Sequence, residues 1–83
     1  MTKSEILDSI LLPLADAFEA GKGHGLPITP ASAEEYELLR ECLAELIAEG
    51  SLIDPKKMKV YHLTQAGYLT YRRRINALRA RGR

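Results

Sequence analysis

The carboxyl-terminal third of the chain carries basic side chains and no acidic ones. Nine lysines and arginines fall within residues 55–83, and no Asp or Glu does. They are Lys56, Lys57, Lys59, Arg72, Arg73, Arg74, Arg79, Arg81 and Arg83. Such side chains neutralise phosphates, in contacts that are largely independent of base sequence. The candidate nucleic-acid-binding residues are Lys56, Lys57, Lys59, Arg72, Arg73, Arg74 and Arg79.

The rest of the chain has the opposite charge. Residues 1–54 hold three lysines and arginines against all eleven acids, a formal charge of −8, so the +9 of the basic third leaves +1 for the whole chain. Charge asymmetry between halves is typical of a basic half that contacts nucleic acid or a membrane surface. It equally fits two halves that attract each other within the folded chain, and the sequence leaves both interpretations open.

Four glutamates form an acidic stripe at helical spacing. They are Glu37, Glu41, Glu45 and Glu49. Like charges four residues apart destabilise a helix by roughly 0.2–0.5 kcal/mol per pair. The stripe is either an ordinary solvated face or a surface that is acidic for a purpose, which is to bind a basic protein partner or to block contact with DNA.

The residues that could support catalysis form no recognisable pattern. His24 and His62 lie 38 positions apart, without the neighbouring ligands of a metal site. Cys42 sits beside an apolar stripe, as a small core residue would. The glycines of residues 21–25 lack the spacing of a phosphate-binding loop and are interpreted as a connector. We therefore expect no enzyme activity, no metal, no cofactor and no small-molecule ligand.

Capping signals and apolar periodicity predict three helices, over about 4–20, 33–49 and 65–80. Thr2 with Glu5 and Ser32 with Glu35 fit the capping box, and Thr64 caps the last helix. Pro13 kinks the first helix, or alternatively opens a second one. Short strands at about 52–53 and 59–63 flank a turn at Asp54-Pro55, which makes a hairpin. The predicted fold is α+β and mainly helical.

The chain is expected to form one domain over residues 1–83, with 79–83 frayed. A core this small buries a limited share of its surface, so a homodimer is expected. Tyr68 and Tyr71 recur with Ile75 and Leu78 at helical spacing, which favours core or dimer packing over base stacking. The chain has no apolar run long enough for a membrane span, no signal-peptide start and only one cysteine. We expect a cytoplasmic protein without membrane contact.

Two phrases resemble the winged helix-turn-helix family. Residues 46–53, LIAEGSLI, are similar to the way the family's recognition helix ends in glycine and enters the first strand of the wing. Residues 61–67, YHLTQAG, look like the family's second wing strand and its "Y-x-L-T-x-x-G" entry into the last helix. The resemblance covers residues 34–75 and implies a winged-helix-like fold, with Lys56, Lys57 and Lys59 on the wing.

The sequence departs from the family in the number of helices before the hairpin, and this changes which family roles we expect here. Residues 26–51 have room for one long helix where the family has two, and the recognition-helix equivalent is the acidic helix 33–49. Four carboxylates in the major groove would meet dense phosphate charge, so that helix is given no recognition role. The resemblance implies a non-enzymatic regulator, for example of a bacterial or mobile-element genome, that binds double-stranded DNA through the wing and the arginine helix. The alternative is a protein-interaction module, as homodimer, adaptor or inhibitor, that binds no DNA.

Overall fold

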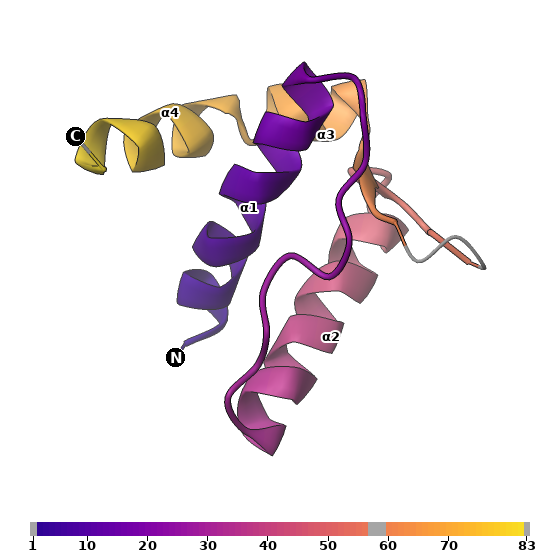
Figure 1. Ribbon diagram of the computed structural model, residues 1–83, viewed down its shortest axis with the longest axis vertical. Helices are drawn as coiled ribbons and strands as arrows, with labels where there is room; N and C mark the ends of the chain where they lie inside the picture. The colour runs from indigo at the N-terminus through magenta and orange to yellow at the C-terminus, as the bar shows by residue number, and fades with distance from the viewer. Residues whose placement is uncertain (1, 57–59, 83) are drawn as a thin grey trace.

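The computed structural model describes residues 2–56 and 60–82. In that part of the chain two long helices, a two-stranded hairpin and two short helices follow one another (Figure 1). The elements are α1 (Lys3–Glu19), α2 (Ala33–Ala48), β1 (Leu52–Ile53), β2 (His62–Leu63), α3 (Gln65–Thr70) and α4 (Arg72–Arg81). The predicted class, α+β and mainly helical, is confirmed. No helix in the described ranges is both long and apolar enough to cross a membrane.

The first helix forms as the sequence predicts. Thr2 and Glu5 make the complete capping box, and α1 then continues through Pro13 as one helix, so the alternative of a second helix opening there is wrong. Gly21 ends it at a φ of 74°, a left-handed conformation that glycine adopts without strain. The apolar stripe of α1 is fully buried, at Ile6, Ile10, Leu11 and Leu14.

The second helix covers one side of that stripe. Ser32 accepts a hydrogen bond from the Glu35 amide at the start of α2, and Gly50 follows its end at a φ of 83°. Leu39, Leu43 and Leu46 of α2 are buried against α1. A single helix thus lies between α1 and the hairpin in the described residues, as expected from the sequence.

The hairpin is antiparallel but its second strand is shorter than predicted. Leu52 pairs with Leu63 and Ile53 with His62, and the two leucines point into the core. Tyr61, placed in the strand by the sequence, instead exchanges two backbone hydrogen bonds with His24. The predicted strand start at Lys59 lies outside the described residues.

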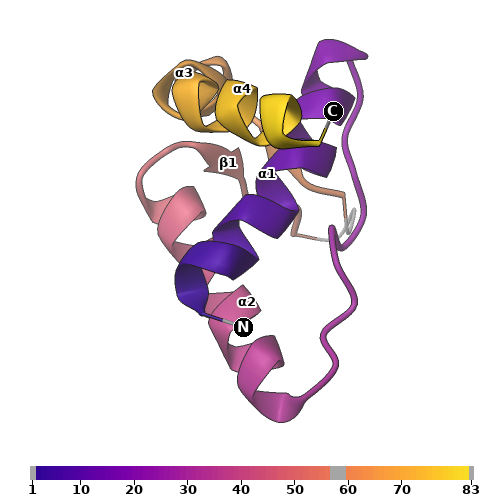
Figure 2. The ribbon, with the colours of Figure 1, turned by 90° about the vertical axis from the view of Figure 1, so that its left-hand side faces the viewer.

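The predicted third helix is in fact two helices, α3 and α4, separated at Tyr71. Two anchors in different directions explain the break. Gly67 of α3 lies against the backbone of Ser51, whereas α4 packs across α1 (Figure 2). Tyr71 accommodates the change with φ −100° and ψ 7°. The sequence predicts that residues 79–83 fray, but residues 79–81 are helical and belong to α4. Arg83 lies outside the described residues.

The close approach of Gly67 to Ser51 gives a test of this packing. A Cβ atom at Gly67 would lie 2.3 Å from the Ser51 carbonyl oxygen, a backbone atom that cannot move aside alone. We expect Gly67→Ala to lower the free energy of unfolding by about 1–3 kcal/mol, measured by urea unfolding. Gly25→Ala is the matched control, since its Cβ meets nothing within 4 Å. It should stay within about 1 kcal/mol of wild type, and an equal loss in both variants would contradict the proposed constraint.

Candidate functional site

Two of the predicted nucleic-acid-binding arginines lie against carboxylates of α1. The Arg74 Nε donates to Asp8, and its Nη2 donates to the Ser4 hydroxyl at 2.8 Å. Arg79 donates to Asp16 at 2.6 Å and to Glu19 at 2.8 Å. Within the described residues the basic half of the chain therefore does attract the acidic half, as one interpretation of the sequence held. These two arginines orient α4 on α1.

Hydrogen bonds from Arg79 and Tyr68 make the Glu19 carboxyl group more acidic. The Arg79 guanidinium and the Tyr68 hydroxyl both donate to this carboxylate, and they lower its pKa to about 2. The Tyr68 ring stacks on Phe18 with ring centroids 4.6 Å apart. Tyr68 is therefore a packing residue of the α1–α3 contact, as the sequence favoured.

Three other predicted cations in the described ranges have no carboxylate partner there. Arg72 and Arg73 are exposed at the first turn of α4. Lys56 is exposed in the hairpin turn, where its amide donates to the Asp54 carboxylate at 3.1 Å. The predicted Lys57 and Lys59 follow directly in sequence and lie outside the described residues.

Lys22 joins this group and was missed by sequence reasoning. The Gly23 backbone lies so close to Val60 and His62 that a Cβ there would clash with both side chains. The His24–Tyr61 backbone pairing holds the same loop on the hairpin. Exposed Lys22 is thus placed beside the lysine-bearing hairpin. The glycine at position 23 was the available signal, because a close backbone approach requires that residue.

The acidic stripe of α2 is partly neutralised. Lys3 donates to Glu45 at 2.6 Å and lies 3.8 Å from Glu41, while Arg40 lies 3.7 Å from Glu37. The hydrogen bond to Glu45 raises the pKa of Lys3. These three carboxylate side chains remain 58–63% exposed. The stripe is therefore a solvent-facing surface that still favours cations over phosphate.

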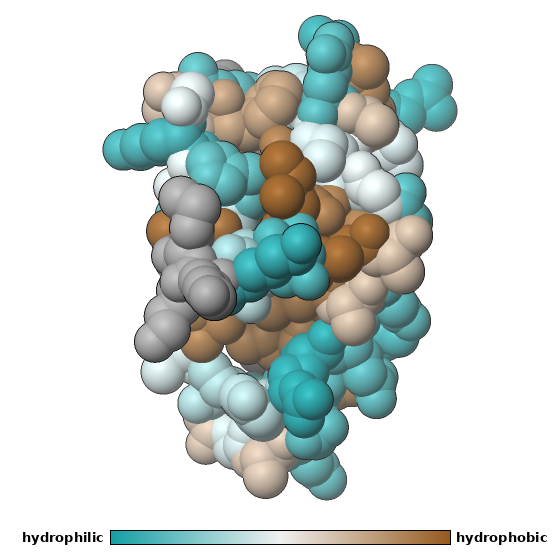
Figure 3. All heavy atoms as spheres, turned by 90° about the vertical axis from the view of Figure 1, so that its right-hand side faces the viewer, coloured by the Kyte–Doolittle hydropathy of each residue, from teal (hydrophilic) through white to brown (hydrophobic). Residues whose placement is uncertain are grey.

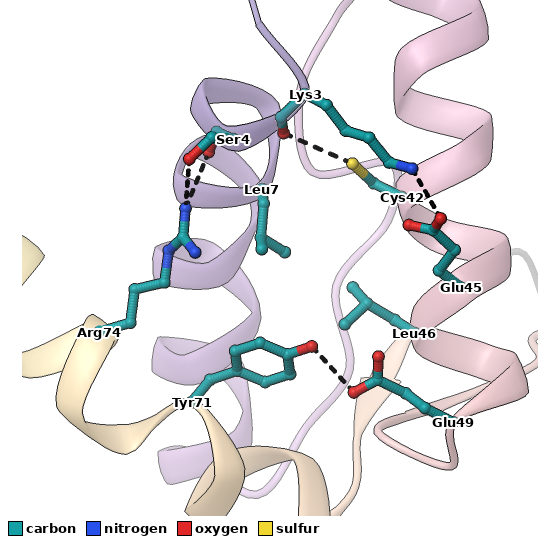
Figure 4. Close-up of a pocket in the computed structure, with 9 residues that line it drawn as sticks. All are labelled: Lys3, Ser4, Leu7, Cys42, Glu45, Leu46, Glu49, Tyr71 and Arg74. Carbon is teal, nitrogen blue, oxygen red and sulfur yellow. Dashed lines mark hydrogen bonds and ion pairs between the residues drawn. The ribbon is translucent and has the colours of Figure 1, made fainter.

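A pocket of about 280 Å³ brings Arg74 together with two glutamates of the stripe (Figure 4). Its lining comes from α1, α2 and the bend at Tyr71. The lining residues are Lys3, Ser4, Leu7, Cys42, Glu45, Leu46, Glu49, Tyr71 and Arg74. No single sequence pattern predicts it, because its residues come from three separate segments.

The polar groups of this pocket are paired with one another. The Tyr71 hydroxyl donates to Glu49 at 2.8 Å, and burial together with this bond raises the pKa of Tyr71 to about 12. The Cys42 thiol lies 3.7 Å from the Lys3 carbonyl oxygen, and burial raises its pKa, which keeps it protonated and a poor nucleophile. The pocket thus joins three helices and presents no activated catalytic group.

Two further hollows lie along the outward face of α2. One, of about 400 Å³, is lined by Glu37, Arg40, Glu41, Leu43, Ala44, Ile47 and Tyr61. The other, also of about 400 Å³, is lined by Ala33, Glu34, Glu37 and Leu38. Figure 3 shows the side of the molecule that carries α2 and the hairpin, where hydrophobic surface gathers around a central hollow with hydrophilic side chains beside it.

The described residues hold no group of three or more His, Cys, Asp or Glu side chains arranged for a metal ion. His24 takes part in backbone pairing with Tyr61, and His62 lies on β2 opposite Ile53. Comparison with protein-family models, with curated proteins and with solved structures gives no match for this chain.

The Glu19–Arg79 contact predicts an acid-dependent loss of stability. Because folding lowers the pKa of Glu19 from 4.5 to about 2, its contribution is complete above about pH 4.5 and is lost as pH falls towards 2. We expect thermal unfolding between pH 5 and pH 2 to show a smaller acid-induced fall in Tm for Arg79→Gln than for wild type. Arg40→Gln, which removes the exposed pair with Glu37 and the contact of the guanidinium with the Tyr36 ring, should follow wild type. If Tm falls with pH in parallel for all three proteins, the Glu19–Arg79 contact is not a source of stability.

Proposed function

We propose that the protein is a non-enzymatic, winged-helix-like DNA-binding protein that contacts the phosphate backbone. The observation that supports this is the distribution of cations without a carboxylate partner. Among the described residues these are Lys22, Lys56, Arg72 and Arg73. Two lie in or beside the hairpin and two at the start of α4. Lys57 and Lys59 extend the hairpin group in sequence.

Contacts of this kind give affinity with little base specificity. Each neutralised phosphate releases condensed counterions, so binding weakens steeply as salt rises. Arg72 and Arg73 are already free of ion pairs to described residues, so binding does not first have to break one. Arg74 and Arg79 are removed from the predicted contact set, because phosphate would have to compete with Asp8, Asp16 and Glu19 for them.

In the proposed complex α2 faces away from DNA. Its outward carboxylates would repel phosphates in the major groove, where the family places the corresponding helix. From the winged-helix resemblance we therefore keep DNA contact by the hairpin, and we assign no DNA contact to α2. The cytoplasmic location and the homodimer remain predictions, and the solution mass measures the latter.

Binding to duplex DNA of random sequence at about 50 and 200 mM salt tests the proposal. We expect Arg72→Gln with Arg73→Gln to weaken binding and to reduce the slope of log affinity against log salt by about 1.8, since each phosphate contact contributes about 0.9. Arg40→Glu is the control, because it lowers the net charge by the same two units from the face of α2. It should leave the slope unchanged.

Two results would count against the proposal. Wild-type affinity that is weak and independent of salt would reject DNA binding and favour the alternative, a protein-interaction module. A double glutamine variant that behaves like the Arg40→Glu control would show that binding does not use the start of α4.

A further inference from the structure

The two hollows on α2 are neighbours along the helix, and we refer to them together as the groove. They share Glu37, and the residues along the middle of the groove are spaced by four or three positions. They are Ala33, Glu37, Arg40, Ala44 and Ile47. Such spacing keeps them on one face of the helix. The groove therefore runs along the 15 residues of 33–47, about 21 Å at 1.5 Å per residue, which is the length of a helix of four turns.

The two sides of the groove differ in chemistry. One side is apolar, with Leu43, Ile47 and Tyr61. The other side carries the carboxylates of Glu34 and Glu41 next to the apolar Leu38. Glu34 is exposed and forms no ion pair with a described residue. Alanines at 33 and 44 lie between the two sides, and the ion pair of Glu37 with Arg40 lies between the alanines.

We propose that this groove binds an amphipathic helix of another protein, with its apolar residues on Leu43, Ile47 and Tyr61 and its lysines or arginines beside Glu34 and Glu41. An amphipathic helix presents apolar anchors at i, i+3, i+4 and i+7, which match a groove that follows a helix. Opposite charge along one rim sets the orientation of the bound helix and speeds its association. This role is separate from DNA binding and does not depend on it.

Neither α4 nor α2 of a second copy is a good occupant of the groove. Its α4 is basic, but the apolar residues that α4 exposes in the described part are small, at Ala77 and Ala80. Its α2 would bring a second set of glutamates against the first, and like charges facing each other across an interface are unfavourable. DNA is excluded by the same negative charge. The chemistry therefore selects a partner helix that is both basic and more bulky than α4.

A pair of synthetic peptides provides the probe. One is a fluorescein-labelled helix of about 15 residues, matched to the groove length, with leucines at the four anchor positions and lysines along one flank. Its twin carries glutamate in place of every lysine. We expect fluorescence anisotropy to show binding of the lysine peptide, and binding of the glutamate peptide weaker by roughly tenfold or more.

Variants in the groove locate the site. Ala44→Arg places a large cation in the middle of the groove and should weaken binding of the lysine peptide by roughly tenfold or more. Ala80→Arg makes the same change at an exposed position of α4 and should leave affinity within about twofold. Glu34→Lys with Glu41→Lys should reverse the preference between the two peptides. All four substituted positions are exposed, so each variant should fold, and circular dichroism melts check this.

Each alternative occupant has its own signature, and each overturns the proposal. Equal binding of the two peptides, or no effect of Ala44→Arg, would show that the groove does not select a basic helix. A solution mass that falls from dimer to monomer in Ala44→Arg alone would identify a second copy as the occupant. A loss of DNA affinity in Ala44→Arg but not in Ala80→Arg would assign the groove to nucleic acid.

Discussion

Burial of the apolar stripe of α1 is the interaction on which the other elements depend. Ile6, Ile10, Leu11 and Leu14 are 0–1% exposed, and α2, β2 and α4 all pack against this helix. A chain of 83 residues has few apolar side chains to spare for a separate core. Both halves must therefore close on α1, and this requirement bends the chain at Tyr71 so that α3 can stay with the hairpin while α4 crosses α1.

The packing of both halves on α1 also determines where the charged side chains lie. Docking α4 on α1 brings Arg74 and Arg79 to Asp8, Asp16 and Glu19. Exposed ion pairs of this kind add little stability individually, so they orient α4 rather than hold it. What remains is a small set of unpaired cations near the hairpin and the start of α4, and a partly neutralised acidic face on α2. The surface of the folded protein is thus less polarised than the sequence, and the location of the remaining charge is set by packing.

Local signals made much of this structure predictable. The caps at Thr2 and Thr64 and the left-handed glycine at Gly50 involve residues within a few positions of one another, and all lie where the sequence places them. The features that were missed all depend on contacts between distant segments. The backbone of Tyr61 pairs with His24 rather than with β1, and Arg79 finds its partners some 60 residues away. A candidate surface defined by residue type alone therefore included arginines that the fold uses internally and omitted Lys22.

The acidic stripe is only partly neutralised within the folded chain. Glutamates four residues apart weaken α2, and the exposed pairs that Lys3 forms with Glu45 and Glu41 and Arg40 forms with Glu37 offset this repulsion only in part. A basic helix in the groove would neutralise Glu34 and Glu41, so the proposed partner would stabilise the helix that it binds. The groove also ends at Tyr61, the residue whose backbone holds the Lys22 loop on the hairpin. A bound helix would therefore contact the base of the hairpin and reinforce the position of Lys22, so the partner surface and the proposed DNA surface would share one structural element.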